Sequence, residues 1–98
     1  SVVINEDSQD IDFRVESNGN ANMLMVNGGG NRVGIGADPD LGVGLHIKTG
    51  DSGGSANANA DELILEGTGS SSGVGMGILS ATDGFGYIIF GEWRLNEI

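Results

Sequence analysis

Three segments of the chain alternate a branched or long apolar residue with a bare glycine, and this alternation limits the possible folds more than any other feature. The segments are Val33-Gly34-Ile35-Gly36, Leu41-Gly42-Val43-Gly44-Leu45 and Val74-Gly75-Met76-Gly77-Ile78. Successive side chains of a strand point to opposite faces, so each segment would form a strand with one apolar face and one nearly bare face. Glycine inside a strand marks a bend, a bulge or a close backbone approach.

We therefore expect an assembly face on the glycine side of these strands, where another sheet or another chain would lie directly on the backbone. The glycines of this predicted face are Gly34, Gly36, Gly42, Gly44, Gly75 and Gly77. The alternative interpretation is that the same segments are poorly ordered loops.

The rest of the chain predicts an all-β fold of short strands. Glycine interrupts almost every apolar stretch, and no window shows a sustained helical spacing of apolar residues. Asn/Gly turns at 18–20 and 27–31 suit the positive φ values of tight turns. The expected strands are residues 10–16, 23–26, 33–36, 41–48, 63–65, 74–78 and 85–95.

Length and glycine content together predict that the chain needs partners. A chain of 98 residues has room for one domain with a thin core, and its 19 glycines weaken that core further. With no cysteines, disulfides cannot compensate, so oligomerisation is the expected support. We divide the chain into a β module over 1–49, a Gly/Ser/Asn-rich loop over 50–60 and a second β segment of the same domain over 61–98.

The charge excludes several classes of partner. The formal net charge is −10, with only four Lys and Arg residues. Nucleic acids and anionic membrane surfaces are bound through basic clusters, and none exists in this sequence. No apolar run approaches the roughly 18 residues that a membrane span needs, so we expect neither nucleic-acid binding nor membrane insertion.

Two glycine-rich stretches imitate catalytic motifs. Residues 50–54 read Gly-Asp-Ser-Gly-Gly, as around the nucleophile of chymotrypsin-like proteases, but the only histidine is His46, four residues before the motif. His46 alternates onto the polar side of its strand and is expected at the surface. Residues 68–75 match the turn of short-chain dehydrogenases, yet the following segment is too short and too glycine-bounded for the helix that binds pyrophosphate. We interpret both as chance matches and expect neither catalytic residues nor a cofactor.

Acidic and aromatic residues offer two further candidate sites. Asp38 and Asp40 flank Pro39, and carboxylates in loops suit Ca²⁺, but no EF-hand or related repeat is present, so we predict no metal site and leave Ca²⁺ binding open. Tyr87 and Trp93 could form a sugar-binding platform. They share one strand face with Phe85 and Ile89, which favours a core or a subunit interface instead.

The first half of the chain resembles a family of phage proteins. The residues that carry the resemblance are Asp12-Phe13-Arg14-Val15-Glu16-Ser17, Asn20-Ala21-Asn22-Met23-Leu24-Met25-Val26, Asn31-Arg32-Val33-Gly34-Ile35-Gly36, Pro39 and Leu45-His46-Ile47. They resemble a module of virion structural proteins in tailed phages, especially tail-fibre and spike-like proteins of marine phages. Met25, Asn27 and Asp38 stand where that module usually has Phe, Asp, and Thr or Ser.

The resemblance implies a function without catalysis. It implies a trimeric, β-rich shaft segment of a virion, assembled in the host cytoplasm, either as a β-sandwich or as an intertwined β-fibre. The alternative is a carbohydrate-binding β-sandwich that recognises a host-surface glycan. The chain end at residues 93–98 is expected to lie within a longer protein.

Overall fold

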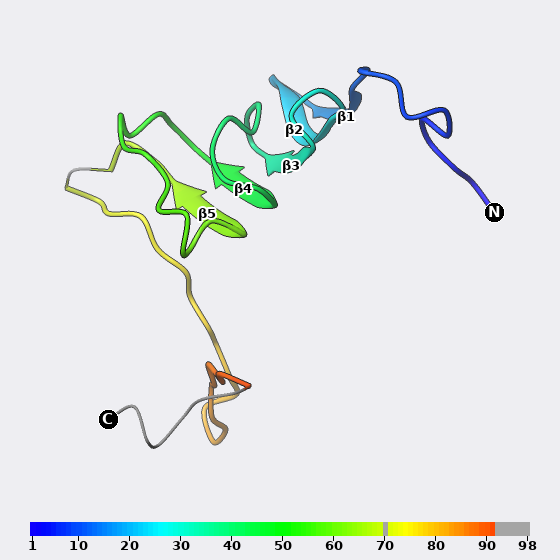
Figure 1. The fold of residues 1–98 in the computed structure, drawn as a ribbon. Coiled ribbons are helices and arrows are strands. Elements are labelled where there is room, and N and C mark those ends of the chain that lie inside the picture. The colour runs from blue at the N-terminus through cyan, green and yellow to red at the C-terminus, as the bar shows by residue number, and fades with distance from the viewer. Residues whose placement is uncertain (70, 92–98) are drawn as a thin grey trace.

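The structure is all-β, as predicted, and is built on one mixed sheet. The computed structural model describes residues 1–69 and 71–91. Five strands follow one another across the sheet in chain order (Figure 1). They are β1 (Phe13–Ser17), β2 (Asn20–Asn27), β3 (Arg32–Ile35), β4 (Leu45–Lys48) and β5 (Leu63–Glu66).

The first three strands form an antiparallel meander whose turns use the predicted Asn and Gly residues. Gly19 between β1 and β2 has φ +91°, a conformation in which a side chain would be strained. Asn31 before β3 has φ 56°, and its N–H donates to the Asn27 carbonyl at 2.9 Å. Asn is the residue after Gly that best tolerates this left-handed geometry.

The last three strands are parallel neighbours, joined by two crossovers without helix. The first crossover covers residues 36–44 and the second covers residues 49–62. Backbone hydrogen bonds tie both to the sheet: the Val33 N–H donates to the Gly44 carbonyl at 3.0 Å and the Leu45 N–H donates to the Glu62 carbonyl at 2.9 Å. Irregular chain can thus replace the usual crossover helix because its backbone groups extend the ladder.

Strand register gives the sheet two different faces. Phe13 pairs with Val26, Val26 with Val33, Val33 with Leu45, and Leu45 with Leu63, so these side chains share one face. We call it the apolar face. Its ten residues are Phe13, Val15, Leu24, Val26, Val33, Ile35, Leu45, Ile47, Leu63 and Leu65.

The opposite face carries most of the buried residues, and we call it the loop-covered face. Met25, Gly34 and His46 are register partners there, and all three are buried. Pro39 in the first crossover lies over them and is also buried. Met25, which is 5% exposed, is the only large hydrophobic residue among the described ones that is buried, so the hydrophobic core of the single chain is very small.

The strand predictions hold for the first two thirds of the chain and fail after it. The strand expected over 41–48 begins only at Leu45, because Gly42 takes φ +77° and bends the chain. Residues 74–78 were expected to form a strand but are not paired. The same is true of 85–91, and the rest of the strand expected over 85–95 lies outside the described residues.

The space beside each glycine predicts how the chain responds to an added side chain there. A methyl group added at Gly34 would lie 2.7 Å from both the Ala37 carbonyl oxygen and the Pro39 Cδ, whereas one added at Gly75 would meet nothing within 4 Å. We expect Gly34→Ala to lower the free energy of unfolding by about 1–3 kcal/mol through overpacking. Gly75→Ala should leave it unchanged or slightly raised. Urea unfolding of both variants measures the difference, and equal stabilities would contradict the described packing of the first crossover.

Candidate functional site

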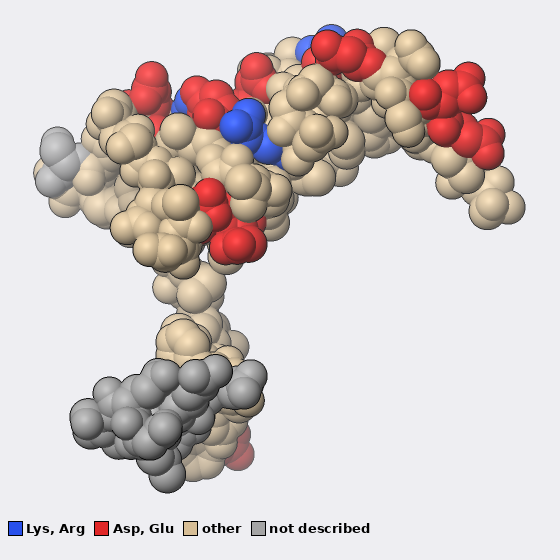
Figure 2. Space-filling view, viewed as in Figure 1, with Lys and Arg blue, Asp and Glu red and all other residues tan. Residues whose placement is uncertain are grey.

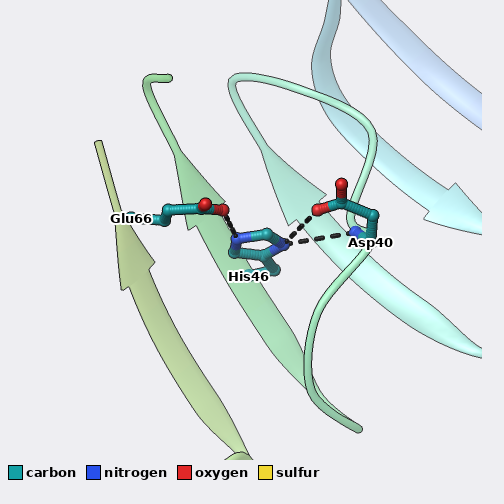
Figure 3. Close-up of side chains that lie close together, drawn as sticks. All are labelled: Asp40, His46 and Glu66. Carbon is teal, nitrogen blue, oxygen red and sulfur yellow. Dashed lines mark hydrogen bonds and ion pairs between the residues drawn. The ribbon is translucent and has the colours of Figure 1, made fainter. Parts of the chain in front are cut away.

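The most densely connected polar group in the described chain centres on His46. Its side chain is completely buried on the loop-covered face (Figure 3). The Nε2 atom lies 2.8 Å from Glu66 Oε1, and the Asp40 N–H points to Nδ1 at 3.3 Å. The expectation of a surface histidine was therefore wrong. Alternation placed His46 on the correct face, but the first crossover folds over that face and Glu66 closes it from the side.

Hydrogen-bond partners determine which ring nitrogen of His46 carries the proton. The backbone N–H of Asp40 can only donate, so Nδ1 must accept and be unprotonated in the neutral ring. Nε2 then carries the hydrogen and donates it to the Glu66 carboxylate. The imidazole thus connects the first crossover on one side with strand β5 on the other.

Glu66 is buried as a carboxylate because it receives several donors. The backbone N–H and the hydroxyl of Ser52 both donate to Oε2 at 2.9 Å. The Ser52 N–H contributes most to a lowered Glu66 pKa. Burial acts against it, and the Ser52 hydroxyl, His46 and Lys48 lower the pKa further. A carboxylate that accepts several hydrogen bonds stays ionised even where water is largely excluded.

Lys48 and Asp40 complete the cluster at its outer side. The Lys48 ammonium donates to the two Asp40 oxygens at 3.1 and 3.0 Å and lies 4.0 Å from Glu66 Oε1. The hydrogen bond to Asp40 raises the pKa of Lys48, although burial lowers it in part. One ammonium therefore sits between two carboxylates, which reduces the cost of burying Glu66.

The geometry does not match nucleophilic catalysis by Ser52. A serine triad needs the hydroxyl to donate to a histidine that is oriented by a carboxylate. Here the Ser52 hydroxyl donates to Glu66, and His46 binds the other oxygen of the same carboxylate. The carboxylate stands where the histidine would have to be, and its lowered pKa makes it a poor base. The Gly-Asp-Ser-Gly-Gly stretch instead anchors the second crossover to β5.

The same cluster contains three residue types that can bind metals. One ligand atom each from Asp40, His46 and Glu66 lie within 4.8 Å of one another. The two carboxylates, however, flank opposite nitrogens of one imidazole, and Figure 3 shows them on either side of the ring. The ligands therefore do not converge on one point, and the Lys48 ammonium already supplies the compensating positive charge. The arrangement is that of a structural tie.

The two carboxylates considered for Ca²⁺ have separate partners. Asp38 Oδ1 accepts a hydrogen bond from the Asn27 side-chain amide at 2.9 Å. Asp40 is paired with Lys48 on the other side of Pro39. Each carboxylate thus links the first crossover to a different strand.

The glycines of the predicted assembly face fall into two groups. Beside Gly34, Gly36, Gly42 and Gly44 the space is filled by the chain's own backbone, from residues 37, 48, 61 and 62. At these four positions the expected close approach is present, but the same chain makes it. Gly75 has nothing within 4 Å, and at Gly77 an added Cβ would lie 3.4 Å from Leu79 Cδ1, so this part of the predicted face is open.

The aromatic candidates lie apart from the His46 cluster. Tyr87 is 69% exposed, and its ring centroid lies 6.4 Å from that of Phe85 with an interplanar angle of 41°. Phe85 and Ile89 are exposed too, so Tyr87 does not belong to a core formed by the described chain. Trp93 lies outside the described residues.

The dinucleotide-like stretch at 68–75 forms a loop. Within it the Gly73 N–H donates to the Gly69 carbonyl at 3.0 Å, and residue 70 lies outside the described residues. No helix follows through residue 91, so the dipole that would bind a pyrophosphate is missing from this part of the chain. In the same described ranges, no helix is long and apolar enough to cross a membrane.

Comparison with known proteins gave no significant match. No protein-family model matches the chain, and no curated protein or solved structure shows significant similarity to it.

The buried cluster predicts unequal costs for its two carboxylates. Glu66→Ala would leave His46 and Ser52 without their buried acceptor, and we expect it to lower the free energy of unfolding by about 3 kcal/mol. Asp40→Ala removes a carboxylate that is 56% exposed, so its loss should be about 1 kcal/mol or less. Urea unfolding at pH 7 and one fixed protein concentration makes the comparison, and a larger loss for Asp40→Ala would refute the proposed role of Glu66.

The lowered pKa of Glu66 also predicts a pH dependence. Its ordinary pKa is 4.5. Its stabilising contribution is therefore fully present above pH 4.5 and is lost as the pH falls through the lower pKa of the folded state. We expect the stability difference between wild type and Glu66→Gln to shrink below pH 4.5. The other carboxylates titrate in both proteins, so their effect cancels in the difference between the two free energies of unfolding. A difference that stays constant from pH 7 to pH 3 would rule out the effect.

Proposed function

We propose that this chain is a non-catalytic structural segment of a phage virion, in a tail-fibre or spike shaft, that assembles as a homotrimer. The resemblance of residues 12–47 to virion modules supplies the biological setting. The physical support is the lack of a self-sufficient core: among the described residues only Met25 is a buried large hydrophobic side chain. A folded chain that leaves this much apolar surface in water gains stability by association.

The His46 cluster supports the non-catalytic part of the proposal. Some described side chains resemble a catalytic set: Asp40, His46, Ser52 and Glu66. Their polar atoms are engaged in contacts that hold the two crossovers on the sheet. Ser52→Ala provides the check. We expect this variant to leave any background ester hydrolysis by the purified protein unchanged, while abolition of a measured hydrolysis would revive an enzymatic function.

A second candidate function is recognition of a host-surface glycan. The exposed, neighbouring rings of Phe85 and Tyr87 favour it, because sugar rings stack on exposed aromatic side chains. Binding on a glycan array that is lost in Tyr87→Ala would favour this function. It is compatible with a fibre, whose tip or side can carry such a site.

Oligomeric state is the decisive measurement for the structural function. We expect size-exclusion chromatography with light scattering to give about three times the mass of the single chain, which is 10.0 kDa. The trimer should dissociate only with unfolding, because the chain's own core is small. A well-folded monomer at micromolar concentration would overturn the self-assembling part of the proposal.

A further inference from the structure

The apolar face of the sheet is an aligned surface of ten side chains. Each of the five strands contributes two of them, and the register places them in two rows across the sheet. One row runs from Phe13 through Val33 to Leu63 and the other from Val15 through Ile35 to Leu65. No charged residue interrupts either row, although the chain carries 14 carboxylates.

Six of the ten side chains of this face are exposed to solvent in the single chain, and the other four, Ile35, Leu45, Ile47 and Leu65, are half-buried. Val15 is 46% exposed, Leu24 38% and Leu63 50%. Burying the exposed part of these side chains against a partner is favourable. The opposite, loop-covered face is already closed by Pro39 and the first crossover. The sheet therefore has one side covered by the chain's own crossovers and one side that is largely open.

The dimensions of the apolar face indicate what kind of partner covers it. The sheet has five strands, and from ordinary strand spacing and rise the face measures roughly 24 Å by roughly 13 Å. Stable interfaces cover about 800 Å² per partner, with an apolar centre inside a polar rim. The face is large enough to be such a centre, and it continues into a cleft of about 460 Å³ that shares Phe13 and Val26 with it.

The lack of charge on the apolar face favours an equally apolar partner surface, that of a second copy, over a basic partner that would bind the carboxylates elsewhere. In the space-filling view, carboxylates lie along the upper edge of the molecule and over the N-terminal segment, with the few Lys and Arg among them, and a further group lies lower on the sheet (Figure 2). Two chains of net charge −10 repel each other wherever those carboxylates meet. They can approach closely only on an uncharged surface, and the apolar face provides one.

We propose that copies of this chain meet through the apolar face, and that the glycine side of strands β3 and β4 is not the interface. The inference rests on the proposed self-assembly and specifies which surface performs it. The chain's own segment 74–91 is a competing occupant. Its first residue, Val74, lines a cavity together with Ile47 and Leu65 of the apolar face, and the rest of the segment runs away from the sheet (Figure 1). It is included as an outcome of the test.

Two adjacent residues of β2 give a matched pair of variants. Leu24 lies on the apolar face and is 38% exposed, whereas Met23 lies on the opposite side and is 42% exposed. Leu24→Lys and Met23→Lys change the net charge equally. We expect light scattering to show that Leu24→Lys reduces the assembly to monomer or weakens it at least 100-fold, while Met23→Lys assembles like wild type.

The outcomes separate this inference from the proposed function. If wild type is a folded monomer, self-assembly itself fails. If wild type and Leu24→Lys assemble equally, self-assembly stands and the apolar face is the wrong surface. If Met23→Lys dissociates and Leu24→Lys does not, the opposite face is the interface.

A second measurement covers the case in which Leu24→Lys does not fold. The chain has no cysteine, so Leu24→Cys and Met23→Cys each introduce a single thiol by a conservative change. In assembled protein we expect maleimide to label the thiol at position 24 at least tenfold more slowly than the one at position 23. Equal rates would overturn the proposal. Slow labelling of position 24 that persists in a monomer would instead assign the apolar face to the chain's own segment 74–91.

Discussion

The hydrogen bond between Glu66 and His46 is the contact on which the parallel half of the sheet depends. It connects β5 to β4 below the surface, and through the two partners it reaches both crossovers: Asp40 on the His46 side and Ser52 on the Glu66 side. Short parallel strands lack the hairpin turns that hold an antiparallel pair together. In this chain a buried polar network holds the parallel strands and their crossovers together, as a layer of helices does in larger proteins.

Because a polar network holds the crossovers, the buried residues on one side of the sheet are largely polar, and the other side has no core in the single chain. The loop-covered face buries a histidine, a carboxylate, a proline and one methionine, which leaves little apolar area to offset chain entropy. A network of this kind specifies the arrangement of the crossovers more than it adds net stability. The proposed burial of the apolar face between copies would supply further stability and would couple folding to association.

The sequence predicted the strands of the meander well, because alternation and Asn/Gly turns are local signals. It predicted the parallel half less well. Leu41 and Val43 continue the alternation of β4, but the turn at Gly42 is decided by close contact with the backbone of Asp61, nineteen positions away. Local patterns cannot report such contacts. Residues 74–78 have the same alternation as β3 and remain unpaired, so alternation alone does not make a strand without a neighbour.

The cluster around His46 was missed for the same reason, although the sequence held a partial signal. The stretches Leu45-His46-Ile47-Lys48 and Leu63-Ile64-Leu65-Glu66 share apolar first and third positions and end in opposite charges. In a parallel pair this places Lys48 beside Glu66. Parallel pairing could not be inferred from an alternation that fits both directions equally, so His46 was left without a partner and assigned to the surface.

The chain order of the strands has a consequence for how such a sheet can vary in length. From β3 onward each crossover returns the chain to the same edge and adds one strand in the same direction. A further crossover and strand after β5 would extend both faces without rearranging the existing ones. The architecture is thus open to growth along its width, whereas removal of β5 would also remove the Glu66 acceptor of His46.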